Sequence, residues 1–508
     1  MSWEILLNIF QPEVLLFTAL GTLIGVVMGA IPGLNSGIGI AILLPFTYRM
    51  EPATALLFLG GLYMGSGYGG SVSGILINVP GTVEASCTAL EGYPMSVKGK
   101  GRQALNYALI SSSFGGLVGV LAMIFLTPLL ASFAVKFGPM EMFLVSLCGL
   151  VIVGSLTGNN IYSGVFAAAF GMFMSMIGID DITGIPRFTF GLKPLIGGIQ
   201  LIPVVIGIFA LAEMIKQALD LRNNEGTATA IHIDNSHIWP IFKDIFSKNG
   251  WLLLKSSVIG ILIGIIPGTG GAISSFIAYG EAKRTSRQSA MFGNGNPEGI
   301  IGPESANNSA VGGALVPMLS LGIPGSSTTA IMFGALLIHG LIPGPNLFIE
   351  NARIGFTFSY GMLLTVVFMF LVGVFGVKIW TRVLKIKLQY LIPIVIASSL
   401  IGAYSVRNST DDVLIAVVFG VVGLLFSKIQ IPTAPIVLGL ILGPLVERNL
   451  TRTLTIIEAK KVSFFSYLVD SPLSLVIVGL TLLMIITTLR VQKKQKLAAA
   501  KEHIDLDE

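Results

Sequence analysis

Four Pro-Gly pairs interrupt apolar stretches of the chain: Pro32-Gly33, Pro80-Gly81, Pro267-Gly268 and Pro324-Gly325. Proline removes an amide hydrogen and clashes with the preceding helical turn, and glycine lets the backbone reverse, so each pair predicts a broken helix. A helix that starts after such a break offers free N–H groups and a partial positive charge, which suits a carboxylate. The residues expected to bind an anionic substrate are therefore the small ones at and after each break: Gly33, Asn35, Ser36, Gly81, Thr82, Gly268, Thr269, Gly270, Gly325, Ser326, Ser327 and Thr328.

A second polar group lies in GPESANNSAVGG (302–313), directly before an apolar run. A carboxyl group at membrane depth is costly and suggests a function, and carboxylate and amide oxygens are ligands that hard cations prefer. The breaks add free backbone carbonyls of the kind that coordinate Na⁺. The residues expected to bind a coupling ion, Na⁺ or a proton, are Asn78, Glu304, Asn307, Asn308 and Ser309.

Each pattern has a purely structural alternative. Pro-Gly in a membrane helix is often only a kink, and Asn307 and Asn308 could cap a helix start with Glu304 at the membrane surface. Four paired motifs favour a site over four kinks, whereas both interpretations of the Glu304 region stay open. The sequence offers no nucleophile–His–acid set, no Cys or His cluster and no phosphate-binding loop, so neither an enzyme nor a cofactor is predicted.

The composition places the chain in a membrane. Of its 508 residues 53% are hydrophobic and only 11% are charged, and the mean hydropathy is +0.84. Soluble domains carry about 25% charged residues. Apolar stretches long enough to cross a bilayer predict an all-α polytopic membrane protein with roughly 11 to 14 membrane elements. The net charge of +5 sits mostly in short loops, which indicates membrane topology rather than nucleic-acid binding.

The two halves of the chain resemble one another. IGVVMGAIPG (24–33) aligns with IGILIGIIPG (259–268), and GGSVSGILINVPGT (69–82) aligns with GGALVPMLSLGIPGS (312–326). A weaker pair, VGSLTGNN (153–160) and IGAYSVRN (401–408), keeps the same order. Matches in constant order indicate a duplication. We expect a first membrane repeat at 13–222, a polar linker at 223–250, a second repeat at 251–446, an extra C-terminal helix within 447–490 and a cytoplasmic tail at 491–508.

The charges indicate that the repeats are inverted. After the second Pro-Gly pair, the first repeat has three basic residues at 98–102 and the second has only Arg353. After the first pair the imbalance reverses, with Arg49 in the first repeat against three basic residues at 283–287. Because basic residues stay in the cytoplasm, equivalent loops lie on opposite sides and the C-terminus is cytoplasmic. Four basic residues fall on the outer side and count against this orientation: Arg448, Arg452, Lys460 and Lys461.

Four long segments carry a resemblance to a known family: GAIPGLNSGIGIAILLPFTY (29–48), NVPGTVEASCTALEGYPMSVKGKGRQAL (78–105), YGEAKRTSRQSAMFGNGNPEGIIGPESANNSA (279–310) and LSLGIPGSSTTAIMFGALLIHGLIPGP (319–345). They are similar to the large membrane subunit of the tripartite tricarboxylate transporters, and the resemblance runs over nearly the whole chain. Two positions depart from the family's pattern. Asn35 stands where the family often has Gly, which bears on the substrate pocket, and Glu91 stands where it often has Asp.

The resemblance implies a secondary active importer in the bacterial inner membrane, working with a small membrane subunit of about four helices and a periplasmic solute-binding protein. It implies carboxylate substrates, citrate and other di- or tricarboxylates, and a Na⁺ gradient or, less favoured, a proton gradient. By analogy with other inverted-repeat carriers we expect elevator-type alternating access, with the arms 104–135 and 354–383 as a static frame and a homodimer contact. A passive organic-anion channel is the alternative, because broken helices also line pores.

Overall fold

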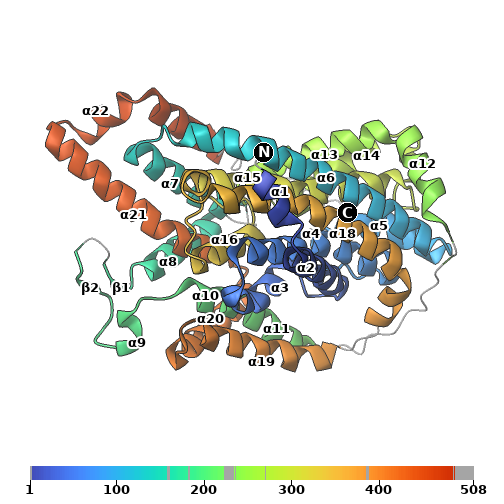
Figure 1. Ribbon diagram of the computed structural model, residues 1–508, viewed down its shortest axis with the longest axis horizontal. Coiled ribbons are helices and arrows are strands. Elements are labelled where there is room, and N and C mark those ends of the chain that lie inside the picture. The colour runs from blue at the N-terminus through green and yellow to red at the C-terminus, as the bar shows by residue number, and fades with distance from the viewer. Residues whose placement is uncertain are drawn as a thin grey trace, which may run out of the picture. The chain divides into compact units, whose positions relative to one another are not determined.

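The computed structural model describes residues 3–156, 161–180, 183–221, 234, 236–268, 270–384, 388–483 and 485–486. These residues are helical almost throughout (Figure 1). The described strands are β1 (Gly178–Ile179) and β2 (Pro186–Arg187), an antiparallel pair with Gly178 opposite Arg187. The predicted all-α fold is confirmed. Thr269, the tail at 491–508, residues 157–160 of the third repeat match and much of the linker lie outside the described residues.

The chain forms two compact units. Unit 1 comprises Met1–Ala134 and Val205–Val421, and unit 2 comprises Val135–Val204 and Val422–Glu508. The units divide the chain differently from the predicted repeats, whose boundaries stay a prediction. The helices α10 (Leu201–Val205) and α20 (Thr410–Lys428) run across unit boundaries.

Unit 2 is a small bundle. Glycines let α8 and α21 approach at backbone distance, because Gly171 lies against the carbonyl of Ile436 and Gly439 lies against that of Ala168. The described helices of this unit are α7 (Pro139–Leu156), α8 (Ile161–Ser175), α9 (Lys193–Ile196), α21 (Ala434–Lys460), α22 (Phe464–Val469) and an apolar helix at Pro472–Leu483.

Unit 1 contains all four Pro-Gly pairs. Its described helices from the first half of the chain are α1 (Trp3–Ile9), α2 (Pro12–Ala30), α3 (Ser36–Leu43), the 3₁₀ helix η1 (Leu44–Arg49), α4 (Pro52–Ile77), α5 (Ser86–Val97), α6 (Gly101–Ala134), the π-helix η2 (Ile206–Leu211) and α11 (Ala212–Leu221). Those that follow are α12 (Ile238–Lys248), α13 (Gly250–Ile265), α14 (Gly270–Thr285), the 3₁₀ helix η3 (Ser289–Met291), α15 (Glu298–Leu321), α16 (Ser327–Ile338), α17 (Pro345–Ile349), α18 (Ala352–Val383) and α19 (Leu388–Arg407).

In the first repeat, α2 and α4 run side by side in the same direction. A Cβ atom placed on Gly25 would lie 2.4 Å from the carbonyl O of Leu62, and one placed on Gly29 would lie 2.4 Å from that of Ser66. Only glycine allows this approach of two backbones. The break after α2 then starts α3, where Gly39 faces the side chains of Met28 and Leu62.

The second repeat contains the same contacts at equivalent positions. Cβ atoms placed on Gly260 and Gly264 of α13 would lie 2.2 Å and 2.7 Å from the carbonyl O atoms of Ala306 and Ala310 in α15. Each glycine lies 235 residues, and each carbonyl 244 residues, after its counterpart in the first repeat. Beyond the break, α14 returns along α15. The duplication therefore extends to the packing of the helices.

The central helices α4 and α15 cross in opposite directions. Asn308 lies against Gly67, and one turn away Glu304 accepts a hydrogen bond from Ser71. Residue numbers therefore rise along one helix as they fall along the other. Because α2 accompanies α4 and α13 accompanies α15, the two repeats run in opposite directions through unit 1. This packing supports the inversion predicted from the charges.

Each long arm packs on the central helix of the other repeat. Cβ atoms placed on Gly115 and Gly119 of α6 would lie 2.1 Å and 2.5 Å from the carbonyl O atoms of Ser305 and Ser309 in α15. In turn α18 packs on α4, where Phe358 meets Gly60. The role of these arms as a static frame stays a prediction.

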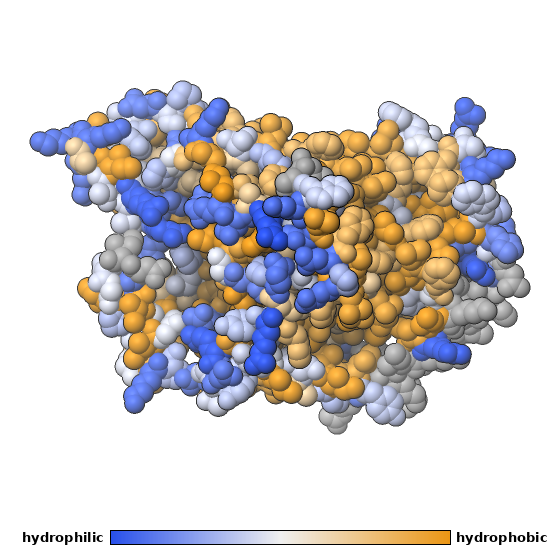
Figure 2. Space-filling view, viewed as in Figure 1, coloured by the Kyte–Doolittle hydropathy of each residue, from blue (hydrophilic) through white to orange (hydrophobic). Residues whose placement is uncertain are grey.

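The described helices are those of a multi-pass membrane protein. Seven are long and apolar enough to cross a membrane, or eight if the pair α12–α13, bent by 82°, counts as one span, and four shorter helices are also apolar. Large apolar side chains are exposed at every fourth position on α6 and on α18, as on a lipid-facing surface, and Figure 2 shows a broad hydrophobic area. The crossing helices α4 and α15 are not among the seven, and both are buried almost throughout.

Candidate substrate and ion sites

The breaks have the same backbone geometry in both repeats. After α2 and α13 the chain passes through an extended residue and a proline to Gly33 and Gly268, whose φ angles are +85° and +82°. This left-handed conformation costs other residues about 1–2 kcal/mol, which explains the glycine. At the second break of each repeat, α4 ends in left-handed Asn78 (φ +57°) and α15 in left-handed Gly322 (φ +72°).

Backbone contacts join the breaks in pairs. The amide of Gly268 donates a hydrogen bond of 2.9 Å to the carbonyl of Gly325, which joins the third break to the fourth. Gly81 packs against the carbonyl of Gly29 at the end of α2, which joins the second break to the first. Gly325 packs in the same way near the carbonyl of Gly264, the counterpart of Gly29. Three of the predicted substrate glycines, Gly81, Gly268 and Gly325, thus lie at contacts between breaks.

Three helix N-termini converge at these breaks. Ser36, the first residue of α3, and Thr328, the second of α16, have their hydroxyl oxygens 2.9 Å apart. A Cβ atom on Gly270, the first residue of α14, would lie 4.0 Å from the Cβ of Ser326, the N-cap of α16. Each N-terminus carries a partial positive charge, so their convergence favours an anion between them.

Two predicted substrate residues cap their own helices. The side-chain oxygen of Asn35 accepts a 3.0 Å hydrogen bond from the amide of Ile38, and Ser326 forms a capping box with Thr329. These two side chains therefore have a structural role as helix caps. This capping leaves other first-turn amides of α3 and α16 without a helical partner, as at any helix start.

The other side chains of the predicted set are less engaged. Ser327 is exposed, and the hydroxyl of Thr82 is buried without a hydrogen-bond partner among the described residues. The hydroxyl of Tyr63, which the sequence did not single out, lies 3.1 Å from that of Ser326. Substrate binding by this set stays a prediction.

Two further residues at the breaks gave no local signal. Gln217 of α11 donates hydrogen bonds of 2.9 Å to the carbonyl of Gly33 and to Glu213. The Cγ of Glu84 would lie 2.8 Å from a Cβ atom on Gly271, in the first turn of α14. Its carboxylate therefore lies next to one of the positive helix ends. Gln217 is 184 residues from its partner glycine, so only tertiary structure reveals the contact.

Glu304 is fully buried in the interior of α15. It accepts hydrogen bonds from three hydroxyls of the first repeat, on α4, α5 and α6; we call Ser71, Thr88 and Ser112 with Glu304 the Glu304 cage. Hydrogen bonds to charged groups contribute about 1.5–3 kcal/mol each, whereas burying a carboxylate costs several kcal/mol. The hydroxyls can offset part of this desolvation but supply no positive charge. Among the described residues Glu304 forms no ion pair.

The remaining residues predicted for the ion divide into two groups. Asn307 donates to the carbonyl of Gly67 (3.4 Å), and the side-chain oxygen of Asn308 is buried without a partner among the described residues. Ser309 instead donates to its own helix at the carbonyl of Ala306, and Asn78 is exposed at the end of α4. The alternative in which Asn307 and Asn308 cap a helix is wrong, because α15 begins at Glu298. Their roles as ion ligands stay predictions.

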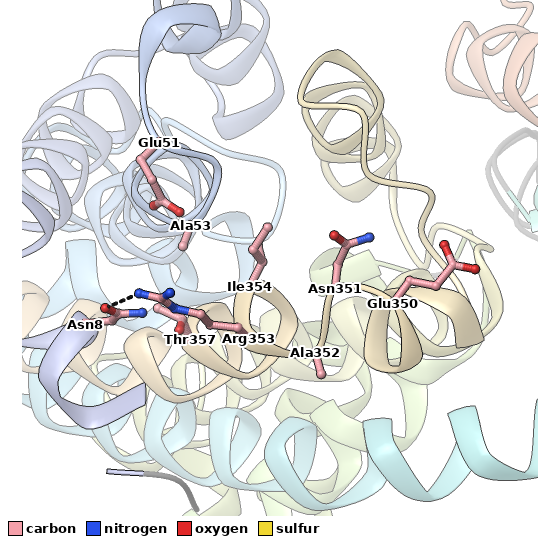
Figure 3. A pocket seen from close by; sticks show the side chains of 9 residues that line it. All are labelled: Asn8, Glu51, Ala53, Glu350, Asn351, Ala352, Arg353, Ile354 and Thr357. Carbon is pink, nitrogen blue, oxygen red and sulfur yellow. Dashed lines mark hydrogen bonds between the residues drawn. The ribbon is translucent and has the colours of Figure 1, made fainter. Parts of the chain in front are cut away.

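A cavity of ≈ 440 Å³ lies away from these residues, at the starts of α4 and α18 (Figure 3). Arg353 donates a 2.8 Å hydrogen bond to Asn8 there, and two carboxylates, Glu51 and Glu350, belong to the lining. None of the predicted site residues takes part. The cavity therefore adds no support to the substrate site predicted at the breaks.

The fold and the paired broken helices define a multi-pass helical membrane protein with an internal duplication. Residues 15–438 match the family model described as "Tripartite tricarboxylate transporter TctA family", and the chain belongs to this family. It is the large subunit of a tripartite transporter, whose other parts are a small subunit and a binding protein.

Two relatives from Agrobacterium vitis are similar in sequence. An "uncharacterized 52.8 kDa protein in TAR-I ttuC' 3'region" is 33% identical over 476 residues, which is 93% of each chain. An "uncharacterized protein in TAR-II ttuC' 3'region" is 32% identical over 230 residues, 45% of this chain and 93% of that one. No solved structure matches the chain.

Proposed function

We propose that this subunit is a binding-protein-dependent secondary active importer of carboxylates, citrate-like di- or tricarboxylates, driven by a Na⁺ gradient or, less favoured, a proton gradient. The periplasmic binding protein delivers the acid, and the small membrane subunit completes the carrier in the inner membrane, with the C-terminus in the cytoplasm. We also propose that the subunit forms a homodimer.

The observation that carries the proposal is the convergence of the N-termini of α3, α14 and α16 at the breaks, with Ser36 and Thr328 in contact. Several positive helix ends at one place suit a substrate that carries more than one carboxylate. The two repeats contribute together, as expected when a substrate binds between inverted halves.

We further propose alternating access of the elevator type, with unit 1 as the body that carries the substrate. All four breaks and the Glu304 cage belong to this unit. A carrier of this kind concentrates its substrate only if a cation binds with it, because the energy comes from the ion gradient.

The test is uptake of labelled citrate by proteoliposomes that contain this chain and the small membrane subunit, with the binding protein outside. A Na⁺ gradient is imposed first and a proton gradient alone second. Accumulation that requires both the binding protein and an ion gradient supports the importer. Accumulation of another carboxylate but not citrate changes only the substrate. Equilibration without accumulation, for every acid tried, favours a passive organic-anion channel and overturns the proposal.

A matched pair of variants addresses the breaks. Asn35→Asp preserves the helix cap, because Asp and Asn cap equally well, but places a negative charge at the converging N-termini. We expect a KM for the carboxylate about tenfold higher or more. Asn294→Asp introduces the same charge in an exposed loop and should leave KM unchanged. Equal KM values for the two variants would place the substrate elsewhere.

A further inference from the structure

The Glu304 cage contains a buried carboxyl group that has no basic partner among the described residues. Glu304 is fully buried, and its described hydrogen-bond partners are neutral hydroxyls. Buried carboxylates in membrane proteins are kept where a cation or proton joins them during function. This inference rests on the proposed ion-driven uptake, and it concerns the place and identity of the ion.

The groups around this carboxylate are oxygens. The hydroxyls of Ser71, Thr88 and Ser112 each donate a hydrogen bond to Glu304, and the lone pairs of their oxygens stay available to a cation. One helical turn further along α15, the side-chain oxygen of Asn308 is buried beside Gly67 and without a partner among the described residues. A site of carboxylate, hydroxyl and amide oxygens suits a hard cation. With one carboxylate, a monovalent cation leaves the site neutral.

The cage also connects the ion to the breaks. It joins α15 of the second repeat to α4, α5 and α6 of the first. Asn307, on the same turn of α15 as Asn308, bonds Gly67 and lies against Gly271 in the first turn of α14. A cation that draws these helices together therefore acts on one of the N-termini that face the substrate.

We propose that the crossing of α4 and α15 holds the coupling Na⁺ ion, with ligands from the Glu304 carboxylate, the hydroxyls of Ser71, Thr88 and Ser112 and the amide oxygen of Asn308. Asn78 and Ser309 take no part, because the first is exposed at a helix end and the second bonds its own helix. The substrate anion binds at the breaks, and the ion balances its charge from within the same unit.

The test measures Na⁺ binding without transport. The full chain with its small subunit is purified in detergent, and thermal stabilisation is titrated with NaCl while KCl holds the ionic strength constant. A ligand that binds the folded state raises the apparent melting temperature in a saturable way. The variants are Glu304→Gln, Thr88→Val and Ser112→Ala. Ser305→Ala is the matched control, since Ser305 lies next to Glu304 but bonds Ser257 and the carbonyl of Leu253.

We expect wild type and Ser305→Ala to share one Na⁺ midpoint. Thr88→Val and Ser112→Ala should need about tenfold more Na⁺, and Glu304→Gln should show no saturable stabilisation. If Glu304→Gln fails to fold, the two hydroxyl variants still decide the matter. An unchanged midpoint in both hydroxyl variants overturns the site. A wild type that responds to pH but not to Na⁺, with the pH response lost in Glu304→Gln, overturns Na⁺ in favour of a proton.

The outcome is separable from that of the proposed function. Na⁺ binding that these variants leave unchanged, together with Na⁺-driven accumulation in proteoliposomes, would refute the site and keep the importer. Na⁺ binding lost in the variants, together with equilibration only, would keep the site and refute the importer.

Discussion

The central helix of each repeat packs on a long arm, and the two contacts are filled differently. In the second repeat α15 presents Glu304 to Ser112 of the arm α6. The equivalent position of α4, 244 residues earlier, is Gly60, which the arm α18 covers with Phe358 and Met362. One of the two equivalent positions carries a hydrogen-bonded acid, and the other is a glycine covered by apolar side chains.

This difference separates what the duplication provides from what each copy does. The glycine contacts between α2 and α4 recur between α13 and α15, so they specify the framework. The acid and its hydroxyls occur where α15 meets α6 and not where α4 meets α18. An inverted pair with one acid can bind one ion per substrate-carrying unit, whereas a symmetric pair would incur the desolvation cost of two buried carboxylates.

The largest effect is expected when an acid is introduced at the equivalent position of the first repeat, Gly60. Gly60→Glu would bury a carboxylate against Phe358 and Met362 without the hydroxyls that surround Glu304. An unpaired buried charge costs several kcal/mol, comparable with the whole stability of a domain, about 5–15 kcal/mol. We expect no folded protein by size-exclusion chromatography in detergent. Gly60→Ala meets only flexible Met362 and the ring of Phe358 and should fold, and a folded Gly60→Glu protein would show that the two environments are not different.

The framework glycines should respond alike in both repeats. Gly29→Ala and Gly264→Ala each push a Cβ atom into the carbonyl of a neighbouring helix, at 2.4 Å and 2.7 Å. Overpacking of this kind costs about 1–3 kcal/mol, and more where backbone has to move. Apparent melting temperatures at one scan rate should fall by similar amounts. The control Gly280→Ala in α14 meets nothing within 4 Å and should be neutral or stabilising. A drop in one repeat only would contradict structural equivalence.

The left-handed glycines share one source of strain in both repeats. Gly33→Ala and Gly268→Ala each place a side chain at a positive φ, which costs about 1–2 kcal/mol. A Cβ atom on Gly33 would in addition lie 2.0 Å from the side-chain nitrogen of Gln217. We therefore expect Gly33→Ala to lower stability and uptake, and Gln217→Ala in the same chain should recover the part of the loss that comes from this clash. A loss that the second change leaves unaltered would show that Gln217 adapts freely.

The smallest effect concerns the contact between the repeats at the breaks. The hydroxyls of Ser36 and Thr328 form one hydrogen bond, worth about 0.5–1.5 kcal/mol. A double-mutant cycle with Ser36→Ala and Thr328→Val should give a coupling energy in that range for stability. If both side chains also bind substrate, the single variants raise KM without lowering stability further. Additive single effects would mean that the two hydroxyls do not interact.

The sequence predicted the breaks and the repeats because their causes are local. Proline and glycine act on the turn that contains them, and loop charge follows membrane side. The cage was not predictable in the same way. Ser71 and Ser320 are both buried serines of the two crossing helices, yet Ser320 bonds its own backbone at Val316 and Ser71 reaches Glu304. Which behaviour a hydroxyl adopts depends on a partner more than 200 residues away.

The apolar stretches at 52–70 and 306–322, which are counted among the expected membrane elements, lie largely within α4 and α15. The expectation of roughly 11 to 14 elements treated hydrophobicity as the signal. The helices α4 and α15 pass no apolar criterion for a span among the described residues, although they run for 26 and 24 residues through the centre of unit 1. Helices that are enclosed by other helices need small residues more than large apolar ones, which lowers their mean hydropathy.

The exchange of arms between the repeats sets an order of assembly during synthesis. The helix α4 emerges from the ribosome early, but the arm α18 that covers Gly60 ends at Val383, when about three quarters of the chain has been made. Until α15 has been synthesised, the arm α6 lacks the helix on which it packs. The first half therefore remains an unfinished domain until the second arrives, and its glycine-lined faces have to be shielded by lipid or by the insertion machinery.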